Sequence, residues 1–182
     1  MALFQTRTIT LKNGKMLTIR NPKLLDAQLL VDYINIVSEE SDNLSFGKGE
    51  APFSKEKEEK YITSLQTNPH KIMALGVIEG EIIAVSDINA NSLPRLKHSG
   101  ELGISLVKKY WNNGVGSALM QYLIDWAKSE GKLRKINLDV NDTNIAAIHL
   151  YKKFGFVEEG RISRGMCING EFIDTICMGL KL

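Results

Sequence analysis

Short segments in which apolar and polar residues alternate, or in which apolar residues run together, predict the β-strands of this chain. Two of these segments flank Glu79-Gly80 and are expected to form a hairpin, and the turn-like Asn13-Gly14 pair precedes the first segment. The Asn169-Gly170 pair is the strongest turn signal in the sequence and predicts a last hairpin around it. The segments before this last hairpin are 16–20, 71–77, 81–87, 101–107 and 135–140.

Apolar residues spaced three and four apart predict four helices, of which the third is the clearest. Ser54 and Asn144 are placed to cap the second and fourth helices, while Gly131 and Gly155 are placed to end the third and fourth. The polar segment 38–53 is expected to be a loop. The apolar positions of the four helices are, in order, Leu29, Leu30, Tyr33, Ile34 and Val37; Tyr61, Ile62 and Leu65; Val115, Ala118, Leu119, Tyr122, Leu123, Trp126 and Ala127; and Ala147, Leu150, Tyr151 and Phe154.

The order of these elements predicts an α/β fold of the mixed (α+β) kind. Strands and helices alternate in the middle of the chain and a hairpin stands at each end, so an all-parallel sheet is excluded. We expect a mixed sheet with helices on both faces. The length of 182 residues is most simply a single domain, 1–182.

Composition and charge narrow the partners of the chain. The 23 Lys and Arg residues are scattered and nearly balance the 21 Asp and Glu residues, so neither nucleic-acid nor membrane-surface binding is indicated. Because no apolar run could cross a bilayer and the first residues lack a secretory apolar core, we expect a cytoplasmic protein. Cys167 and Cys177 suit a reducing compartment. His70, His98 and His149 show no ligand spacing, so no metal is expected.

The stretch WNNGVGSALM, residues 111–120, carries the first candidate chemistry, with Gly114 and Gly116 at the start of the third helix. A dinucleotide-binding fold would need a further glycine at Leu119, and a P-loop would need a Lys-Ser/Thr pair after Gly116, so both interpretations fail. Two hypotheses remain open on the local pattern. One is a tight turn without a ligand; the other is a loop whose backbone amides enclose a pyrophosphate at the positive end of the helix.

The neighbouring segments favour the pyrophosphate loop, because together they resemble the GNAT superfamily of N-acetyltransferases. The resemblance covers about the last two thirds of the chain. It is specific in the x-x-G-x-G loop after the strand ELGISLV, and in one longer pattern. That pattern is N-x-x-A-x-x-L-Y-x-x-x-G-F, formed by Asn144, Ala147, Leu150, Tyr151, Gly155 and Phe156. The chain departs from the family at Trp111, where Arg or Gln is usual.

The resemblance implies a GNAT-type twisted sheet of about six to seven strands flanked by about four helices. It also implies that acetyl-CoA is the cosubstrate. The thioester would lie at the end of the strand that contains Ile104, Ser105 and Leu106, where the Leu106 backbone would bond the pantetheine arm or polarise the carbonyl. Asn144 would bond the pantetheine arm, cap its helix, or do both. The pyrophosphate would be held by Asn112, Asn113, Gly114, Val115, Gly116 and Ser117.

Acetyl transfer to an amine needs a neutral amine, a polarised carbonyl and a proton for the departing thiolate. The resemblance makes Tyr151 the candidate general acid, since a phenol stays protonated at neutral pH; without the resemblance, Tyr151 would be interpreted as a core aromatic. Glu101 is the first candidate base, acting through water, and Asp139 is the second; an enzyme without a dedicated base is the alternative. No Cys or Ser stands in a nucleophile arrangement, so direct transfer is expected.

The expected function is therefore acetyl transfer from acetyl-CoA to a primary amine of a small molecule, protein or peptide. A non-catalytic acyl-CoA-binding regulatory module is the alternative, and Tyr151 favours the enzyme. The carboxylates of the segment after the first helix could attract a polyamine or could be solvated loop charges. They are Glu39, Glu40, Asp42 and Glu50. The sequence leaves the acceptor and a possible homodimer open.

Overall fold

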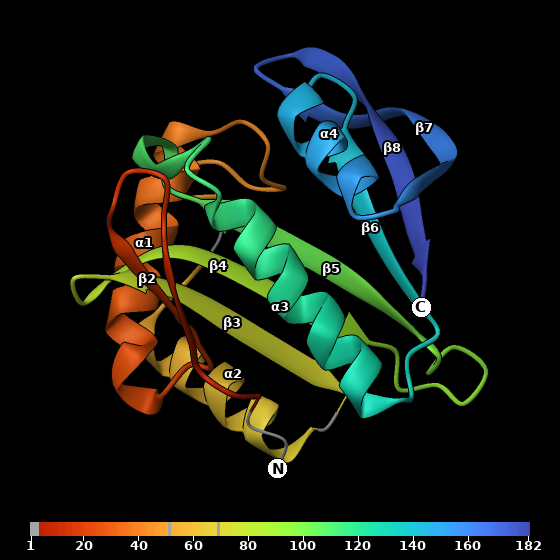
Figure 1. Ribbon diagram of the computed structural model, residues 1–182. Coiled ribbons are helices and arrows are strands. Elements are labelled where there is room, and N and C mark those ends of the chain that lie inside the picture. Colours follow the sequence, from red (N-terminus) through yellow and green to blue (C-terminus); the bar gives the residue numbers. More distant parts are fainter. Residues whose placement is uncertain (1–3, 51, 69) are drawn as a thin grey trace.

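One mixed sheet forms the centre of the fold in the computed structural model, which describes residues 4–50, 52–68 and 70–182 (Figure 1). In these residues the sheet has eight strands in the order β1-β2-β3-β4-β5-β6-β8-β7. Only β5 and β6 are parallel; all other neighbours in the described sheet are antiparallel. The strands are β1 (Arg7–Thr10), β2 (Met16–Arg20), β3 (Lys71–Ile78), β4 (Glu81–Ala90), β5 (Ser99–Leu106), β6 (Lys135–Asn141), β7 (Val157–Ile168) and β8 (Glu171–Lys181).

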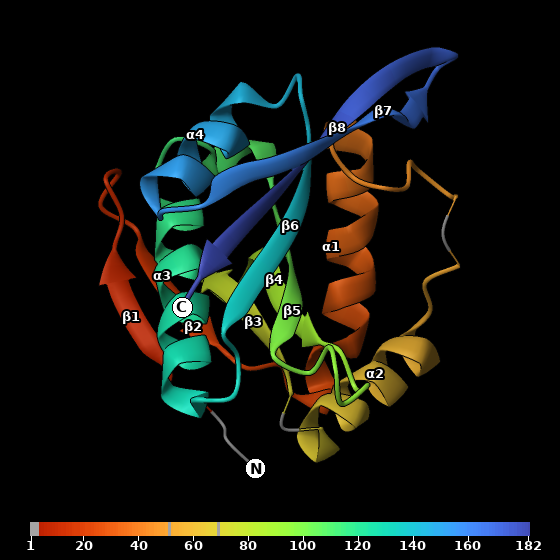
Figure 2. The same ribbon diagram turned by 90° about the vertical axis from the view of Figure 1, so that its right-hand side faces the viewer.

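Four α-helices of the described chain cover the two faces of this sheet. Figure 2 shows α1 and α2 on one side of the sheet and α3 and α4 on the other. Short 3₁₀ turns, Leu24–Asp26 and Lys108–Tyr110, precede α1 and α3. The helices are α1 (Ala27–Glu40), α2 (Lys55–Thr67), α3 (Val115–Glu130) and α4 (Ile145–Lys153). The expected mixed sheet with helices on both faces is confirmed.

Local sequence signals account for the helix boundaries. Ser54 Oγ accepts a hydrogen bond from Lys57 N at 3.4 Å and starts α2, and Gly131 ends α3 with a left-handed φ of +65°. The apolar stripe of α3 faces the sheet, where its burial supplies the main driving force for packing. Its fully buried members are Val115, Leu119, Tyr122, Leu123, Trp126 and Ala127.

Two features differ from the expected elements. The additional strand β1 pairs with β2 across the Asn13-Gly14 turn, and its residues are half-buried or exposed at the sheet edge, so no apolar run marks it. Helix α1 continues to Glu40, so the loop begins at Ser41 and not at residue 38. Nothing in the sequence of residues 38–40 breaks a helix, and the Ser38 hydroxyl bonds back to Asn35 O within it.

The sheet divides between β5 and β6, and this division positions the site. The two strands pair only from Ser99 and Lys135 to Glu101 and Asn137. Beyond this point β5 follows β4, while β6 follows β8, so the carboxyl ends of the two parallel strands diverge (Figure 1). Ligands of open α/β sheets bind at such carboxyl ends, where neighbouring strands separate.

Candidate active site

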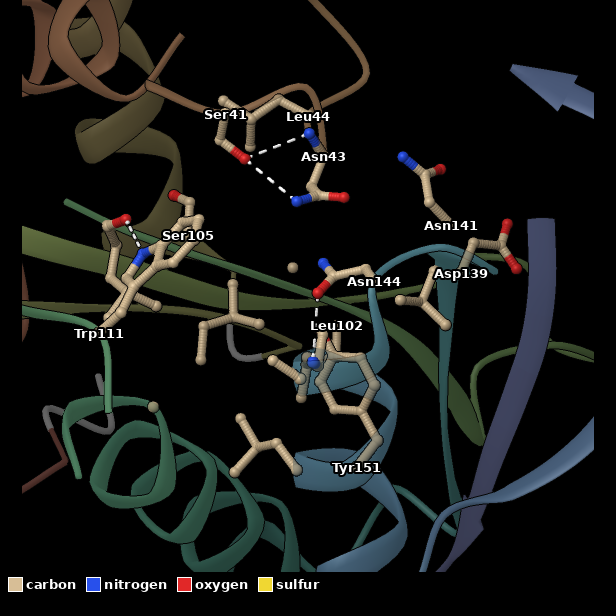
Figure 3. A pocket seen from close by; sticks show the side chains of 18 of the residues that line it. Ser41, Asn43, Leu44, Leu102, Ser105, Trp111, Asp139, Asn141, Asn144 and Tyr151 are labelled. Carbon is tan, nitrogen blue, oxygen red and sulfur yellow. Dashed lines mark hydrogen bonds between the residues drawn. The ribbon is translucent and has the colours of Figure 1, made fainter. Parts of the chain in front are cut away.

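The gap between β5 and β6 contains a cavity of about 770 Å³, within the range typical of small-molecule sites. Its walls come from β5, β6, the loop before α3, helix α4 and the loop Ser41–Phe46. Figure 3 shows Ser41, Asn43 and Leu44 on one side of the gap and Tyr151 on the other. Ile104 and Ser105 point to opposite faces of β5, and both line the cavity, which therefore passes through the sheet.

The backbone of β5 presents hydrogen-bonding groups to this cavity. Val107 N donates to Ile83 O and Asn91 N donates to Ser99 O, so the odd-numbered residues of β5 form the ladder with β4. Because ladder bonds alternate along a strand, the peptide groups of the even-numbered residues point into the gap. Beyond Glu101, no strand of the described chain pairs with that edge of β5. A ligand with amide groups can therefore bond to Leu102, Ile104 and Leu106.

Trp111 occupies one of these groups. Its indole Nε1 donates to Leu106 O at 3.0 Å, and its ring lines the cavity (Figure 3). Trp111 N also donates to Lys108 O, so the residue ties the Lys108–Tyr110 turn to the end of β5. The Leu106 backbone was expected to bond the pantetheine arm or to polarise the thioester carbonyl, and its own carbonyl oxygen already accepts one hydrogen bond from Trp111. The Leu106 N–H remains directed at the gap.

The loop before α3 presents backbone amides at one end of the cavity. Asn112 and Gly114 have φ angles of +61° and +90°, and backbones that change hand between successive residues direct neighbouring N–H groups to one side. Ala118 N donates to Gly114 O, so the N–H groups of the first three helical residues, 115–117, have no acceptor within the helix. The helix dipole adds positive potential at this point, so the loop has the features that suit an anion.

The two glycines of this loop are required for different reasons. Gly114 adopts a left-handed conformation that favours glycine. A Cβ at Gly116 would lie 3.1 Å from Leu150 Cδ2, so the packing of α4 against α3 also keeps this position small. Asn113 and Val115, both expected to bind the pyrophosphate, do not have side chains in the cavity wall; Val115 is buried in the core. Only their backbone groups could serve a ligand.

Asn144 caps α4 and lines the cavity at the same time. Its Oδ1 accepts a hydrogen bond from Ala147 N at 3.2 Å, which satisfies one of the free amides at the start of the helix (Figure 3). The side-chain amide nitrogen takes no part in this bond. The cap therefore leaves a donor that can bond a ligand carbonyl.

Tyr151 lies on α4 where the helix borders the cavity. Its side chain is buried against Phe156, with ring centroids 6.0 Å apart, and burial raises the pKa of the phenol to about 12. Within the described residues no group hydrogen-bonds to its hydroxyl, and Figure 3 shows its ring beside Leu102 and Asn144. A protonated phenol without a protein partner is able to donate to a ligand atom.

The structure separates the two candidate bases. Glu101 lies at the last β5–β6 pair, accepts a hydrogen bond from Asn137 Nδ2 at 3.3 Å and is not part of the cavity wall. Asp139, two residues after Asn137 on β6, lines the cavity. A hydrogen bond to Asp139 is the main cause that raises the pKa of Cys177, its partner on β8. Asp139 therefore borders the cavity directly, whereas Glu101 lies outside its wall.

The carboxylates at the end of α1 and in the loop after it make contacts within the protein. Glu39 pairs with Lys48 at 2.6 Å, Glu40 Oε2 accepts from Lys108 N at 2.7 Å, and Glu50 Oε2 accepts from Gly47 N at 2.7 Å. Neither these three side chains nor that of Asp42 line the cavity. The contacts favour their interpretation as structural loop charges.

Comparison with known proteins identifies the family to which the chain belongs. The profile described as the acetyltransferase (GNAT) family matches residues 35–156, about two thirds of the chain. The chain belongs to the GNAT family. The expected family and enzyme class, an acyltransferase, are confirmed, and its sheet has eight strands in the described residues where six to seven were expected.

Individual relatives of this GNAT protein differ in the acceptors that their names give. A GNAT-family acetyltransferase from Streptococcus pneumoniae has a crystal structure with a TM-score of 0.89 and 38% identity, covering 91% of this chain and 99% of that one. An L-amino acid N-acetyltransferase of Escherichia coli (strain K12) is 34% identical over 101 residues, 56% of this chain but only 62% of the relative. A spermidine N(1)-acetyltransferase of Vibrio cholerae is 29% identical over 121 residues, 66% of this chain and 68% of the relative.

Sequence reasoning did not name the residues that line one end of the GNAT cavity. Leu44 and Phe46 of the loop, Asn141 of β6 and Met166 of β7 line it, and Asn141 Nδ2 donates to Asp42 O at 3.4 Å, which helps hold the loop there. The available signal was the pair of apolar residues at 44 and 46 in an otherwise polar loop.

In the described residues no helix is long and apolar enough to span a membrane, and no cluster of His, Cys, Asp and Glu has the form of a metal site.

Proposed function

We propose that this GNAT protein transfers an acetyl group from acetyl-CoA directly to the primary amine of a small molecule or peptide. The observation that carries the proposal is the single cavity that passes through the sheet. It joins the amide-bearing loop before α3 to a second end beneath the loop Ser41–Phe46. Two substrates can therefore meet between β5 and β6, each from its own face of the sheet, without a carrier on the enzyme.

The residues of the first end fit acetyl-CoA. The free N–H groups of residues 115–117 would hold the pyrophosphate, and Lys153 and His149 line the same cavity and can face further phosphate charge. The peptide groups of β5 that point into the gap would bond the amides of the pantetheine arm. The donor of Asn144 that its capping bond leaves free would bond a carbonyl of that arm.

The transfer balances without an enzyme-bound intermediate. The amine nitrogen forms a bond to the thioester carbonyl carbon, and the carbon–sulfur bond breaks. Tyr151 gives its phenolic proton to the departing sulfur, and the proton lost by the amine nitrogen restores the phenol, through water. The sum is one amide and one free thiol, and the acetyl-CoA thioester supplies the only activated bond required.

The amine must lose its ammonium proton before it attacks. Asp139 lines the cavity and Glu101 lies at the point where β5 and β6 separate, so each is a candidate to accept this proton. Glu101→Gln and Asp139→Asn variants distinguish the two, because loss of a base lowers kcat/KM about 10²- to 10⁴-fold and alters its pH profile. Parent-like profiles in both variants would support an enzyme without a dedicated base.

The experiment that tests the proposal is a screen of thiol release from acetyl-CoA with and without a library of primary amines and peptides. The proposal predicts release that depends on the amine, together with one acetylated product per thiol. Tyr151→Phe serves as the matched control, since it removes one hydroxyl and keeps the ring. Intact acetyl-CoA binding with no active acceptor would favour a non-catalytic acyl-CoA-binding module.

A further inference from the structure

The second end of the cavity, beneath the loop Ser41–Phe46, has a distinct chemical character; we name it the acceptor end. Its apolar wall includes Leu44, Phe46 and Met166, and its polar wall includes the uncharged amides of Asn43 and Asn141. Asp139, an exposed residue, is the only carboxylate among the described residues that line the cavity. The acceptor end therefore offers one negative charge and a largely uncharged surface.

The remaining carboxylates near the loop, those of Glu39, Glu40, Asp42 and Glu50, lie outside the cavity wall. Glu39, Glu40 and Glu50 are held by Lys48, Lys108 N and Gly47 N respectively. A second ammonium group of a bound polyamine would therefore lie against apolar or neutral side chains. Moving a charge out of water without a partner is strongly unfavourable, so such a ligand is disfavoured.

We infer that the acceptor is a compact monoamine whose body is uncharged and mostly apolar; this rests on the proposed acetyl transfer. Asp139 attracts the single ammonium group as it enters. Leu44, Phe46 and Met166 contact the apolar body. Asn43 and Asn141 can bond an amide or hydroxyl of that body, and Figure 3 shows their side chains on neighbouring sides of the gap.

The size of the cavity supports a compact acceptor. The volume of about 770 Å³ includes the space along β5 that the pantetheine arm would occupy. Only part of it is left for the amine, and the loop Ser41–Phe46 covers that part. Amino-acid amides and short alkylamines have the required size and carry a single charge.

The test compares matched amines by steady-state kinetics at saturating acetyl-CoA. Pentylamine and 1,5-diaminopentane have the same chain length and differ in one ammonium group, while leucinamide and spermidine extend the comparison. We expect kcat/KM for pentylamine to exceed that for the diamine by at least about tenfold, because the second charge has no partner. Leucinamide should exceed spermidine by a similar factor.

An added carboxylate should move this preference. Asn43→Asp places a second carboxylate in the acceptor end at an exposed loop position, and should raise the diamine-to-monoamine ratio of kcat/KM about two- to fivefold, as expected for an exposed ion pair. Glu39→Gln is the matched control, because this side chain lies outside the cavity, and its ratio should equal that of the parent.

The outcomes distinguish failure of the monoamine preference from failure of acetyl transfer itself. A diamine or spermidine that is acetylated as well as its monoamine partner overturns the inference and leaves acetyl transfer standing. An unchanged ratio in Asn43→Asp also overturns it, since the acceptor would then bind elsewhere. If acetyl-CoA binds but no amine in the comparison increases thiol release, both the proposed function and this inference are wrong.

Discussion

At the scale of single residues, Tyr151 combines burial with a hydroxyl that no described group of the protein bonds. Tyr151→Phe should lower kcat about 10²- to 10⁴-fold if the phenol is the general acid. The ring and its contact with Phe156 are retained, so acetyl-CoA affinity and the free energy of unfolding should stay near those of the parent. Initial rates measure kcat, calorimetric titration measures acetyl-CoA affinity, and urea denaturation measures the free energy of unfolding. A parent-like kcat would exclude the role.

The burial of Tyr151 also predicts how kcat depends on pH. Burial disfavours the charged phenolate and raises the pKa of Tyr151 to about 12. The donor therefore remains protonated as the pH rises, and kcat should show no alkaline decline from this group below about pH 10. A pH–rate profile of the parent enzyme checks this, with stability monitored in parallel. A descending limb near pH 8 that is absent in Tyr151→Phe would contradict the raised pKa, because Tyr151 would then lose its proton near pH 8.

Ser117 offers a sharper test of the anion site than either glycine, because Gly116 also accommodates Leu150. Ser117→Asp puts a negative charge in the first turn of α3, where the helix dipole stabilises it by about 0.3–1 kcal/mol. The same charge repels a bound pyrophosphate. We therefore expect unchanged or slightly increased thermal stability together with weaker acetyl-CoA binding, measured by calorimetric titration. Ser117→Asn, of similar shape without charge, is the control, and equal affinity in both variants would refute the phosphate loop.

At the scale of elements, substitutions at Asn144, the cap of α4, distinguish its structural role from a binding role. Ser is about as good a helix cap as Asn, whereas Ala costs about 0.5–2 kcal/mol. Asn144→Ser should therefore keep the free energy of unfolding, and Asn144→Ala should lower it by about that amount. Both variants lose the amide donor, so both should bind acetyl-CoA about 2- to 12-fold more weakly, as expected for one hydrogen bond. Parent-like affinity in Asn144→Ser would leave Asn144 as a cap alone.

The start of α1 is fixed to β2 by a partly buried ion pair. Arg20 donates to both carboxylate oxygens of Asp26, at 2.7 and 2.8 Å, and Lys23 N donates at 2.6 Å. Burial by itself would raise the pKa of Asp26, but these bonds outweigh it and hold the pKa below its ordinary value. The associated stability is present above the unfolded-state pKa and is lost as the pH falls through the lower, folded-state value.

Asp26→Asn should therefore destabilise the protein at neutral pH, by about 1.5–3 kcal/mol, as expected for the loss of hydrogen bonds to a charged group. The difference in unfolding free energy between parent and variant should shrink as the pH falls below about 4, where the parent loses the same charge. Urea denaturation over a pH series measures it. A difference that is constant over this range would show that the pair contributes through packing alone.

These elements also show what sequence can and cannot predict. The α3 stripe, the Ser54 and Asn144 caps and the Gly131 ending are local signals, and each is confirmed. The four residues of β1 carry no such signal, because pairing with β2 at the sheet edge defines the strand. Whether Asp139 or Glu101 meets the cavity depends on where β5 and β6 stop pairing, which is a non-local property.

At the scale of the whole molecule, the division of the sheet brings two distant parts of the chain together. The loop Ser41–Phe46 from the first third and the α3–α4 region from the last half line one cavity on opposite faces. Lys108 N donates to Glu40 at the end of α1, and Asn141 Nδ2 donates to Asp42 O in the loop. The loop and the helix end before it are therefore tied to both halves of the divided sheet. This geometry provides for two substrates bound at once.

The most direct test of direct acetyl transfer is the initial rate of thiol release, measured over a matrix of acetyl-CoA and amine concentrations. Direct transfer within the cavity predicts double-reciprocal lines that intersect, because both substrates must be bound before any product leaves. It also predicts no thiol burst without amine. Parallel lines, or a stoichiometric burst from acetyl-CoA alone, would show an acetylated enzyme and would contradict transfer through the gap between β5 and β6.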